Sequence, residues 1–227
     1  MDLQVFENPE AVARAAASVI AADAREAVAA RGQFSLAVSG GHTPWIMLRA
    51  LAAEDIPWTA MHLFQVDERV APEGDPDRNF THLRESLLQH VPLASEHVHA
   101  MPVEMADLEA AARQYAVALQ KIAGTPPVLD LVHLGLGPDG HTASLVPGDP
   151  VLQVRDADVA LTGPYQGRRR MTLTYPVLNQ ARRVLFVVTG GDKVKMTRRL
   201  LDGDPSIPAG AVRAEHALVM ADRAAVE

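Results

Sequence analysis

Short apolar runs, each followed by a helical pattern, constrain the fold of this chain more than any other feature. The clearest run occupies residues 129–136, LDLVHLGL, and such a nearly continuous run is typical of a parallel strand covered on both faces. Similar runs occupy residues 34–38, 61–66 and 184–188. Between them lie segments with helical spacing of apolar residues, as at 107–123. The alternation predicts an α/β fold with a mostly parallel sheet and helices on both faces.

The C-terminal third adds a weaker pattern. Residues 159–162 and 171–175 have the composition of short strands, which predicts a small additional β element. The 227 residues are 48% hydrophobic and only 4% aromatic, enough for one large aliphatic core. We therefore expect a single domain over residues 1–227.

Composition excludes several classes of function. The chain has 28 acidic and 21 basic residues, a net charge of −7, so no general polyanion-binding surface and no nucleic-acid partner are expected. It has no cysteine, which excludes disulfides, thiolate catalysis and cysteine-ligated zinc. Neither a secretory signal in MDLQVFENPE nor an 18-residue apolar run is present, which predicts a cytoplasmic protein without a membrane partner.

Glycines follow the strand predicted at 34–38. Ser39, Gly40 and Gly41 precede Thr43 and Pro44, and the free backbone N–H groups of such a loop can cradle a phosphate. A plain tight turn fits the same residues. The loop matches neither the P-loop motif nor the dinucleotide fingerprint, so ATP and NAD are not supported and no cofactor is expected.

A second glycine-rich exit follows residues 129–136 and carries Gly137, Asp139 and His141. A histidine on a loop of this kind is a candidate for ligand binding or proton transfer, although an isolated surface histidine is the alternative. Residues 142–144 are predicted to start a helix, whose N–H groups would favour an anion beside His141. Asp139 either orients His141 or only forms the turn, and the turn is the favoured interpretation.

Charged residues follow the other two strands. Asp67, Glu68 and Arg69 come directly after residues 61–66, where they form either a solvated strand end or part of a ligand site, with Arg69 binding phosphate or carboxylate. Lys193 stands at the start of a helix, an unfavourable place for a cation, and so indicates an anionic partner.

Residues 168–170 are three successive arginines in an acidic chain. They form either a solvated strand edge or an anion-binding cluster, in which Arg170 is our candidate for matching the charge of a phosphate. His97 and His99 would share one face of a strand, a spacing compatible with a metal ion, but no third ligand is evident and no metal is expected. Asn79 is predicted to cap a helix over residues 79–89.

In a parallel sheet these strand exits meet at one edge. They would supply backbone donors, Lys193, Arg69 and a candidate base, His141, in a single crevice. The sequence therefore predicts a site for a small phosphorylated substrate.

These residues also carry a family resemblance. The motifs SGGHTP, DER, LGLGPDGHTASLVPG, RMTLT and TGGDK are similar to those of the 6-phosphogluconolactonases related to glucosamine-6-phosphate deaminase, over about residues 34–212. The resemblance implies a Rossmann-like fold, no metal, and hydrolysis of 6-phospho-D-glucono-1,5-lactone to 6-phosphogluconate in the pentose phosphate pathway. Such an enzyme has a phosphorylated sugar lactone as its partner, and we expect a monomer or a small homo-oligomer.

The resemblance also implies roles for individual residues. His141 would be the general base, and Arg69 and Lys193 would hold the substrate. The remaining residues expected to contact or line the substrate site are Ser39, Gly40, Gly41, Thr43, Asp67, Gly137, Asp139 and Arg170. The chain departs from the family pattern at Arg78, where serine is common, and at Val146, where an aromatic is common.

Two alternatives remain. A glucosamine-6-phosphate deaminase would require glutamate five residues after the loop histidine, where this chain has Val146. A non-catalytic sugar-phosphate-binding domain, as in some transcription regulators, would require an attached DNA-binding segment, for which the α/β pattern leaves no room and no basic helix is evident.

Overall fold

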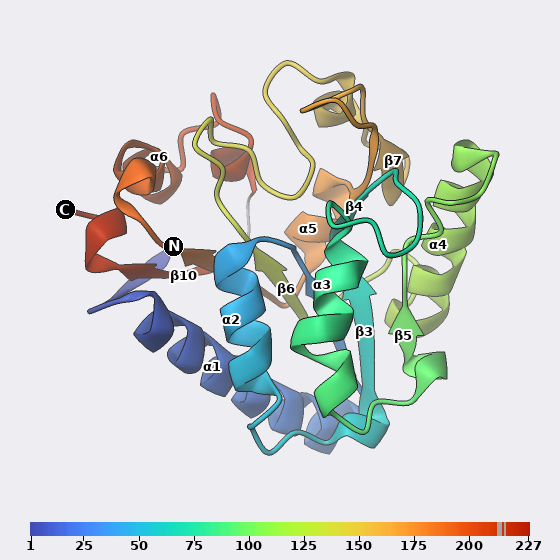
Figure 1. Cartoon of the computed structure of the whole chain (residues 1–227), viewed down its shortest axis with the longest axis horizontal. Coiled ribbons are helices and arrows are strands. Elements are labelled where there is room, and N and C mark those ends of the chain that lie inside the picture. Colours follow the sequence, from blue (N-terminus) through green and yellow to red (C-terminus); the bar gives the residue numbers. More distant parts are fainter. Residues whose placement is uncertain (213–214, 216) are drawn as a thin grey trace.

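The computed structural model describes residues 1–212, 215 and 217–227, which form a seven-stranded sheet and a three-stranded sheet (Figure 1). Every neighbouring pair in the larger sheet is parallel, as predicted. In spatial order its strands are β1 (Asp2–Phe6), β10 (Ala217–Asp222), β9 (Arg183–Val188), β6 (Leu131–Leu134), β2 (Phe34–Val38), β3 (Met61–Gln65) and β5 (Val98–His99).

Helices cover both faces of this sheet. On one face lie α1 (Pro9–Arg31), α2 (His42–Leu51) and α3 (Asn79–Ser86), whose apolar residues share one core; Figure 1 shows α2 and α3 in front of β6 and β3. On the other face lie α4 (Leu108–Ala123), α5 (Tyr175–Gln180) and α6 (Val194–Leu201), packed in a second core. The predicted α/β, Rossmann-like architecture is confirmed.

Alternate side chains of each central strand enter the two cores. In β9, Leu185 and Val187 belong to the core of α1 and α2, whereas Val184, Phe186 and Val188 belong to the core of α4 to α6. Because both faces are buried, residues 184–188 of this strand are all apolar and do not alternate with polar residues.

Local signals set the ends of the longest helix. The Asn8 side chain accepts a hydrogen bond from the Ala11 N–H at 2.9 Å, and Pro9 occupies the first turn. Gly32 has φ of 79° and donates its N–H to the Val28 carbonyl, which closes the helix.

The small antiparallel sheet has the order β4 (Asp67–Arg69), β8 (Arg170–Leu173) and β7 (Val159–Leu161). It confirms the additional β element predicted from the C-terminal third. It also corrects one interpretation: Asp67 and Glu68 are 4% and 0% exposed, so they are not a solvated strand end. β4 pairs with β8, whose Met171 and Leu173 belong to the second core.

The strand order reverses between β2 and β6. From β2 the chain continues to β3 and β5 on one side, and from β6 it continues to β9 and β10 on the other. In open α/β sheets such a switch point leaves a crevice at the carboxyl ends of the strands. The exits of β9, β6, β2 and β3 therefore lie next to one another.

Three histidines pack together at the far edge of the sheet. His62 on β3 lies beside His99 on β5, with 3.2 Å between Nδ1 and Nε2, and the His97 ring is 4.3 Å from that of His62. Burial, with the neighbouring His62, His97 and Lys121 charges, lowers the pKa of His99 to about 4. Within the described residues no group of three or more histidines or carboxylates could hold a metal ion, and no helix there is long and apolar enough to cross a membrane.

This cluster predicts acid sensitivity. An unfolded histidine has a pKa of about 6.5. Between pH 6.5 and 4, His99 is therefore protonated in the unfolded chain but neutral in the folded chain. The free energy of unfolding therefore decreases as the pH falls through this range. His99→Gln should reduce the slope of unfolding free energy against pH by up to about 1.4 kcal/mol per pH unit.

Denaturant unfolding at several pH values measures this slope. The matched control is His90→Gln, because His90 is exposed. Equal slopes in wild type and His99→Gln would contradict the prediction.

Candidate active site

A cavity of about 510 Å³ opens at the carboxyl ends of the central strands. Ten of the residues predicted for the site line it: Ser39, Gly40, Gly41, Thr43, Asp67, Arg69, Gly137, His141, Arg170 and Lys193. Asp139 does not line the cavity but contacts His141. Segments far apart in sequence are thus gathered as the parallel topology predicts.

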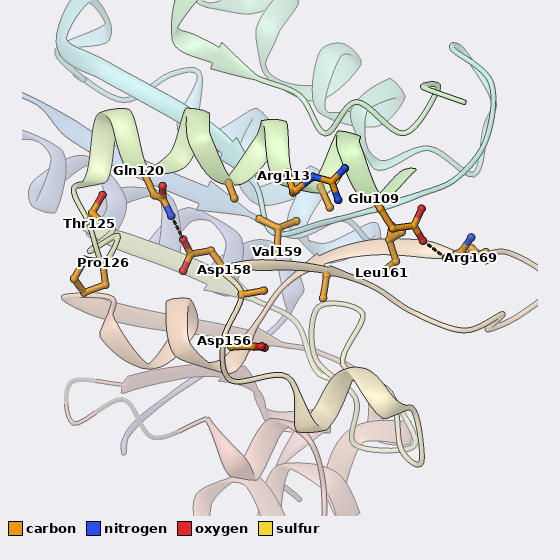
Figure 2. Close-up of a pocket in the computed structure, with 14 residues that line it drawn as sticks. Glu109, Arg113, Gln120, Thr125, Pro126, Asp156, Asp158, Val159, Leu161 and Arg169 are labelled. Carbon is orange, nitrogen blue, oxygen red and sulfur yellow. Dashed lines mark hydrogen bonds and ion pairs between the residues drawn. The ribbon is translucent and has the colours of Figure 1, made fainter. Parts of the chain in front are cut away.

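A larger groove, of about 740 Å³, lies between α4 and residues 156–161 (Figure 2). None of the predicted site residues lines it. Figure 2 shows that several of its polar side chains are paired within the protein: Gln120 donates to Asp158 at 2.7 Å, and Arg169 lies 3.6 Å from Glu109. The chemistry of the lining residues therefore favours the smaller cavity as the site.

The buried His133 holds the glycine loop that begins at Ser39 in place. Ser39 donates its hydroxyl to the His133 carbonyl at 3.1 Å, and its N–H donates to Nδ1 of His133 at 3.3 Å. Burial lowers the pKa of His133 to about 3, so the ring stays neutral and can accept this bond. Ser39 therefore fixes the loop, and sequence analysis missed His133 because it stands inside an apolar run.

Close packing explains the glycines of this loop. A Cβ on Gly40 would overlap the Asn79 side chain, and Gly41 has φ of 123°, which side chains rarely allow. At the end of the loop the Thr43 hydroxyl lies 2.5 Å from that of Thr189, which joins the exits of β2 and β9. Ser39, Gly40, Gly41 and Thr43 of this loop all line the cavity.

The helix expected at residues 142–144 is wrong. Thr142 and Leu145 form an isolated bridge around a tight turn, and Ala143 has φ of 51°, which is incompatible with a right-handed helix. The Thr142 hydroxyl donates to the Gly135 carbonyl at 2.8 Å and closes the loop on itself. His141 therefore receives no helix dipole, and its environment depends on side chains.

His141 is paired with Asp139. Its Nδ1 lies 2.5 Å from Asp139 Oδ1, and its backbone N–H donates to the same oxygen at 3.1 Å. Burial raises the pKa of Asp139, but these bonds outweigh burial and bring it below the usual value. The interpretation of Asp139 as a turn residue alone is therefore wrong. In the described part of the chain, His141 Nε2 has no hydrogen-bond partner.

Asp67 is held by two polar side chains. Ser144 donates its hydroxyl to Asp67 Oδ2 at 2.5 Å, and the Asn79 amide donates to the Asp67 carbonyl at 3.0 Å. The prediction that Asn79 caps α3 is wrong, because Arg78 occupies the N-cap position and the Asn79 side chain turns toward the cavity. The Asn79 amide also donates to Asp67 Oδ1 at 3.3 Å, so both carboxylate oxygens of Asp67 accept hydrogen bonds within the protein.

Glu68, next to Asp67, is completely buried and organises this wall. Its carboxylate accepts hydrogen bonds from the N–H groups of Arg69, Asn79 and Phe80 at 2.7 to 2.8 Å and from the Gln65 amide at 2.9 Å. Arg78 Nε lies 3.1 Å away as a buried counter-charge. The only sequence signal for this role of Glu68 was its position between two candidate site residues, Asp67 and Arg69.

The three successive arginines separate in the structure. Arg168 pairs with Asp75 and Asp77 at 3.1 and 2.8 Å, and Arg169 is exposed near Glu109, so the charged-edge interpretation fits these two. Arg170 is only 4% exposed and lines the cavity.

Two arginines that line the cavity each have a buried, unpaired donor. In the described residues, the buried Nε atoms of Arg69 and Arg170 have no hydrogen-bond partner. Burial lowers the pKa of Arg170, and the neighbouring Arg69 adds to this effect. Two close cations with unpaired donors favour an anionic ligand. Lys193, at the end of the 3₁₀ helix η5 (Gly191–Lys193), adds a third positive group and lies 2.9 Å from Asp192.

Fold and site together define a class: an α/β protein with a histidine–carboxylate pair and a cavity lined by three cationic side chains at a topological switch point. The chain belongs to the glucosamine-6-phosphate isomerase/6-phosphogluconolactonase family, whose model matches residues 7–221.

Individual relatives agree with this assignment. The chain is 42% identical to a 6-phosphogluconolactonase of Synechocystis over 74% of this chain and 71% of that one. It is 38% identical to that of Mycobacterium tuberculosis over 97% and 95% of the two chains. The crystal structure of 6-phosphogluconolactonase from Thermotoga maritima superposes with a TM-score of 0.87, at 27% identity and covering 97% of this chain and 98% of that one.

The loop geometry predicts that Gly137 is required for the position of His141. A Cβ at residue 137 would overlap the His141 ring, whereas a Cβ on Gly135, two residues earlier, would meet nothing within 4 Å. Gly137→Ala should therefore displace the ring and break its bond to Asp139, and Gly135→Ala should not.

The downfield Nδ1 proton of His141 in ¹H–¹⁵N NMR spectra measures this bond. We expect it in wild type and Gly135→Ala and expect its loss in Gly137→Ala. The same resonance in all three proteins would show that Gly137 has no such role.

Proposed function

We propose that this protein is a 6-phosphogluconolactonase, which hydrolyses 6-phospho-D-glucono-1,5-lactone to 6-phosphogluconate in the pentose phosphate pathway. The observation that carries the proposal is the His141–Asp139 pair at a cavity with two buried, unpaired arginine Nε donors. The relatives named above carry the same activity in their names.

His141 acts as the general base. Asp139 holds Nδ1, which leaves Nε2 to accept a proton from a water molecule, and imidazole exchanges protons near neutral pH. The water oxygen bonds to the lactone carbonyl carbon as the carbonyl becomes an oxyanion. The bond from that carbon to the ring oxygen then breaks, and the His141 proton passes to the ring oxygen. The product is an open chain with one carboxyl and one new hydroxyl group.

Arg69 and the loop N–H groups are the candidates for stabilising the oxyanion. Arg69 is fixed by its NH1 bond to the Asp77 carbonyl at 2.6 Å and by its backbone bond to Glu68. A donor held in place before the reaction stabilises developing charge without reorganising. Arg69 also lines the cavity.

Lys193 and Arg170 bind the phosphate, with Gly41 and Thr43 beside them. All four line the cavity, and the two cations come from different elements, Lys193 from η5 and Arg170 from β8. The phosphate is not the reacting group, and its binding orients the reacting atoms and so lowers the barrier.

The deaminase alternative is less well supported. Val146 stands where such an enzyme would need glutamate and is an apolar residue, 4% exposed. A monomeric glucosamine-6-phosphate deaminase has a TM-score of 0.87 but 20% identity, which supports the fold alone. The cytoplasmic location, the single domain, metal independence and the monomer or small homo-oligomer stay predictions.

Loss of the base gives the main test of the mechanism. His141→Ala should reduce kcat by roughly 10²–10⁴-fold, the usual worth of a positioned general base, while product affinity and melting temperature stay near wild type. His42→Ala is the matched control, because His42 also lines the cavity but has no carboxylate partner among the described residues. Its effect should be only a few-fold. Near wild-type turnover of His141→Ala would refute the assignment.

Phosphate recognition gives a second test. Unphosphorylated gluconolactone should have a much lower kcat/KM than the 6-phosphate, and Lys193→Ala should reduce the difference between the two substrates. Steady-state rates corrected for spontaneous hydrolysis measure both values. Equal kcat/KM for the two lactones would exclude the proposed role of Lys193 and Arg170.

A further inference from the structure

Tyr165 does not line the cavity, but it contacts the proposed base pair, His141 and Asp139, and the proposed phosphate-binding residue, Arg170. It lies in the hairpin between β7 and β8, where its N–H donates to the Arg168 carbonyl at 2.9 Å. From there its hydroxyl reaches the carboxylate of Asp139 and its ring lies beside Arg170 and His141.

The hydroxyl completes the anchoring of Asp139. Tyr165 donates to Asp139 Oδ2 at 3.0 Å, while Oδ1 accepts from His141. A carboxylate held at both oxygens has a fixed plane, and the orientation of the His141 ring depends on that plane. Burial and the Asp139 bond raise the pKa of Tyr165, so its hydroxyl remains a donor at neutral pH.

The Tyr165 ring contacts Arg170, the arginine proposed to bind the substrate phosphate. The Arg170 guanidinium carbon lies 4.8 Å from the centre of the Tyr165 ring, and the His141 ring meets it edge to face at 5.5 Å. Arg170 also donates to Gln166, the next residue of the hairpin, at 3.1 Å. The aromatic face therefore supports the guanidinium from outside the cavity.

We infer that Tyr165 is a positioning residue with two separable effects: its hydroxyl holds Asp139 and thereby His141 for proton transfer, and its ring holds Arg170 for binding of the phosphate. The inference rests on the proposed function, since it assigns these roles within the lactonase site.

Two substitutions separate the effects. Tyr165→Phe keeps the ring and removes the hydroxyl, so kcat should fall about 10-fold, as for other outer partners of a functional histidine, while KM stays within about twofold. Tyr165→Leu removes both, so KM should also rise, by about fivefold, the worth of one cation–π contact.

A double-mutant cycle tests whether the hydroxyl acts through Asp139. In an Asp139→Asn background, adding Tyr165→Phe should change kcat by less than about twofold, because the group that it holds has already lost its charge. Full additivity of the two kcat losses would overturn the inference.

Tyr175→Phe is the matched control. Tyr175 also donates to an oxygen, the Pro208 carbonyl at 2.9 Å, and also has an arginine over its ring, Arg155 at 5.4 Å, but neither Pro208 nor Arg155 lines the cavity. This variant should lose thermal stability and keep kcat and KM. If Tyr165→Phe behaves in the same way, its role is structural and the inference is wrong.

A measurement independent of turnover distinguishes failure of the inference from failure of the proposed function. The Nδ1 proton of His141 should shift in ¹H–¹⁵N NMR spectra of Tyr165→Phe and not of Tyr175→Phe. No hydrolysis by wild type would overturn the proposed function alone, whereas an unchanged Nδ1 proton in Tyr165→Phe would overturn the positioning role.

Discussion

One wall of the cavity depends on the buried carboxylate of Glu68. An ionised group without solvent is very unfavourable unless it is paired and hydrogen-bonded, and Glu68 has an arginine and four N–H donors. Those donors belong to β3, β4 and the start of α3, so satisfying the charge fixes all three relative to one another. Asp67 and Arg69 take their positions in the cavity from this arrangement.

Much of the fold was predictable because parallel strands leave a strong signal. Runs buried on both faces are mostly apolar, and β2, β3, β6 and β9 all fall where such runs occur. Parallel topology then carries their exits to one edge, so the lining of the cavity by the glycine loops, Arg69, His141 and Lys193 followed from strand order alone.

The polar contacts beneath the site were not predictable, since they join residues far apart in sequence. Glu68 and Asn79 are eleven positions apart, Ser39 and His133 are 94 apart, and Asp139 and Tyr165 are 26 apart. The expected helix at 142–144 failed for a similar reason: a bond from Thr142 to Gly135 and a bridge to Leu145 close a turn that local propensity does not specify.

The geometry of the site and the similarity to known 6-phosphogluconolactonases independently support the same activity. The most direct test is hydrolysis of the phosphorylated lactone by the wild-type protein. The substrate is unstable, so it should be generated in the assay and followed by NMR alongside its spontaneous hydrolysis. We expect the rate of lactone hydrolysis to be proportional to protein concentration and well above the spontaneous rate, with 6-phosphogluconate as the product. A rate equal to spontaneous hydrolysis at every concentration of folded protein would contradict it.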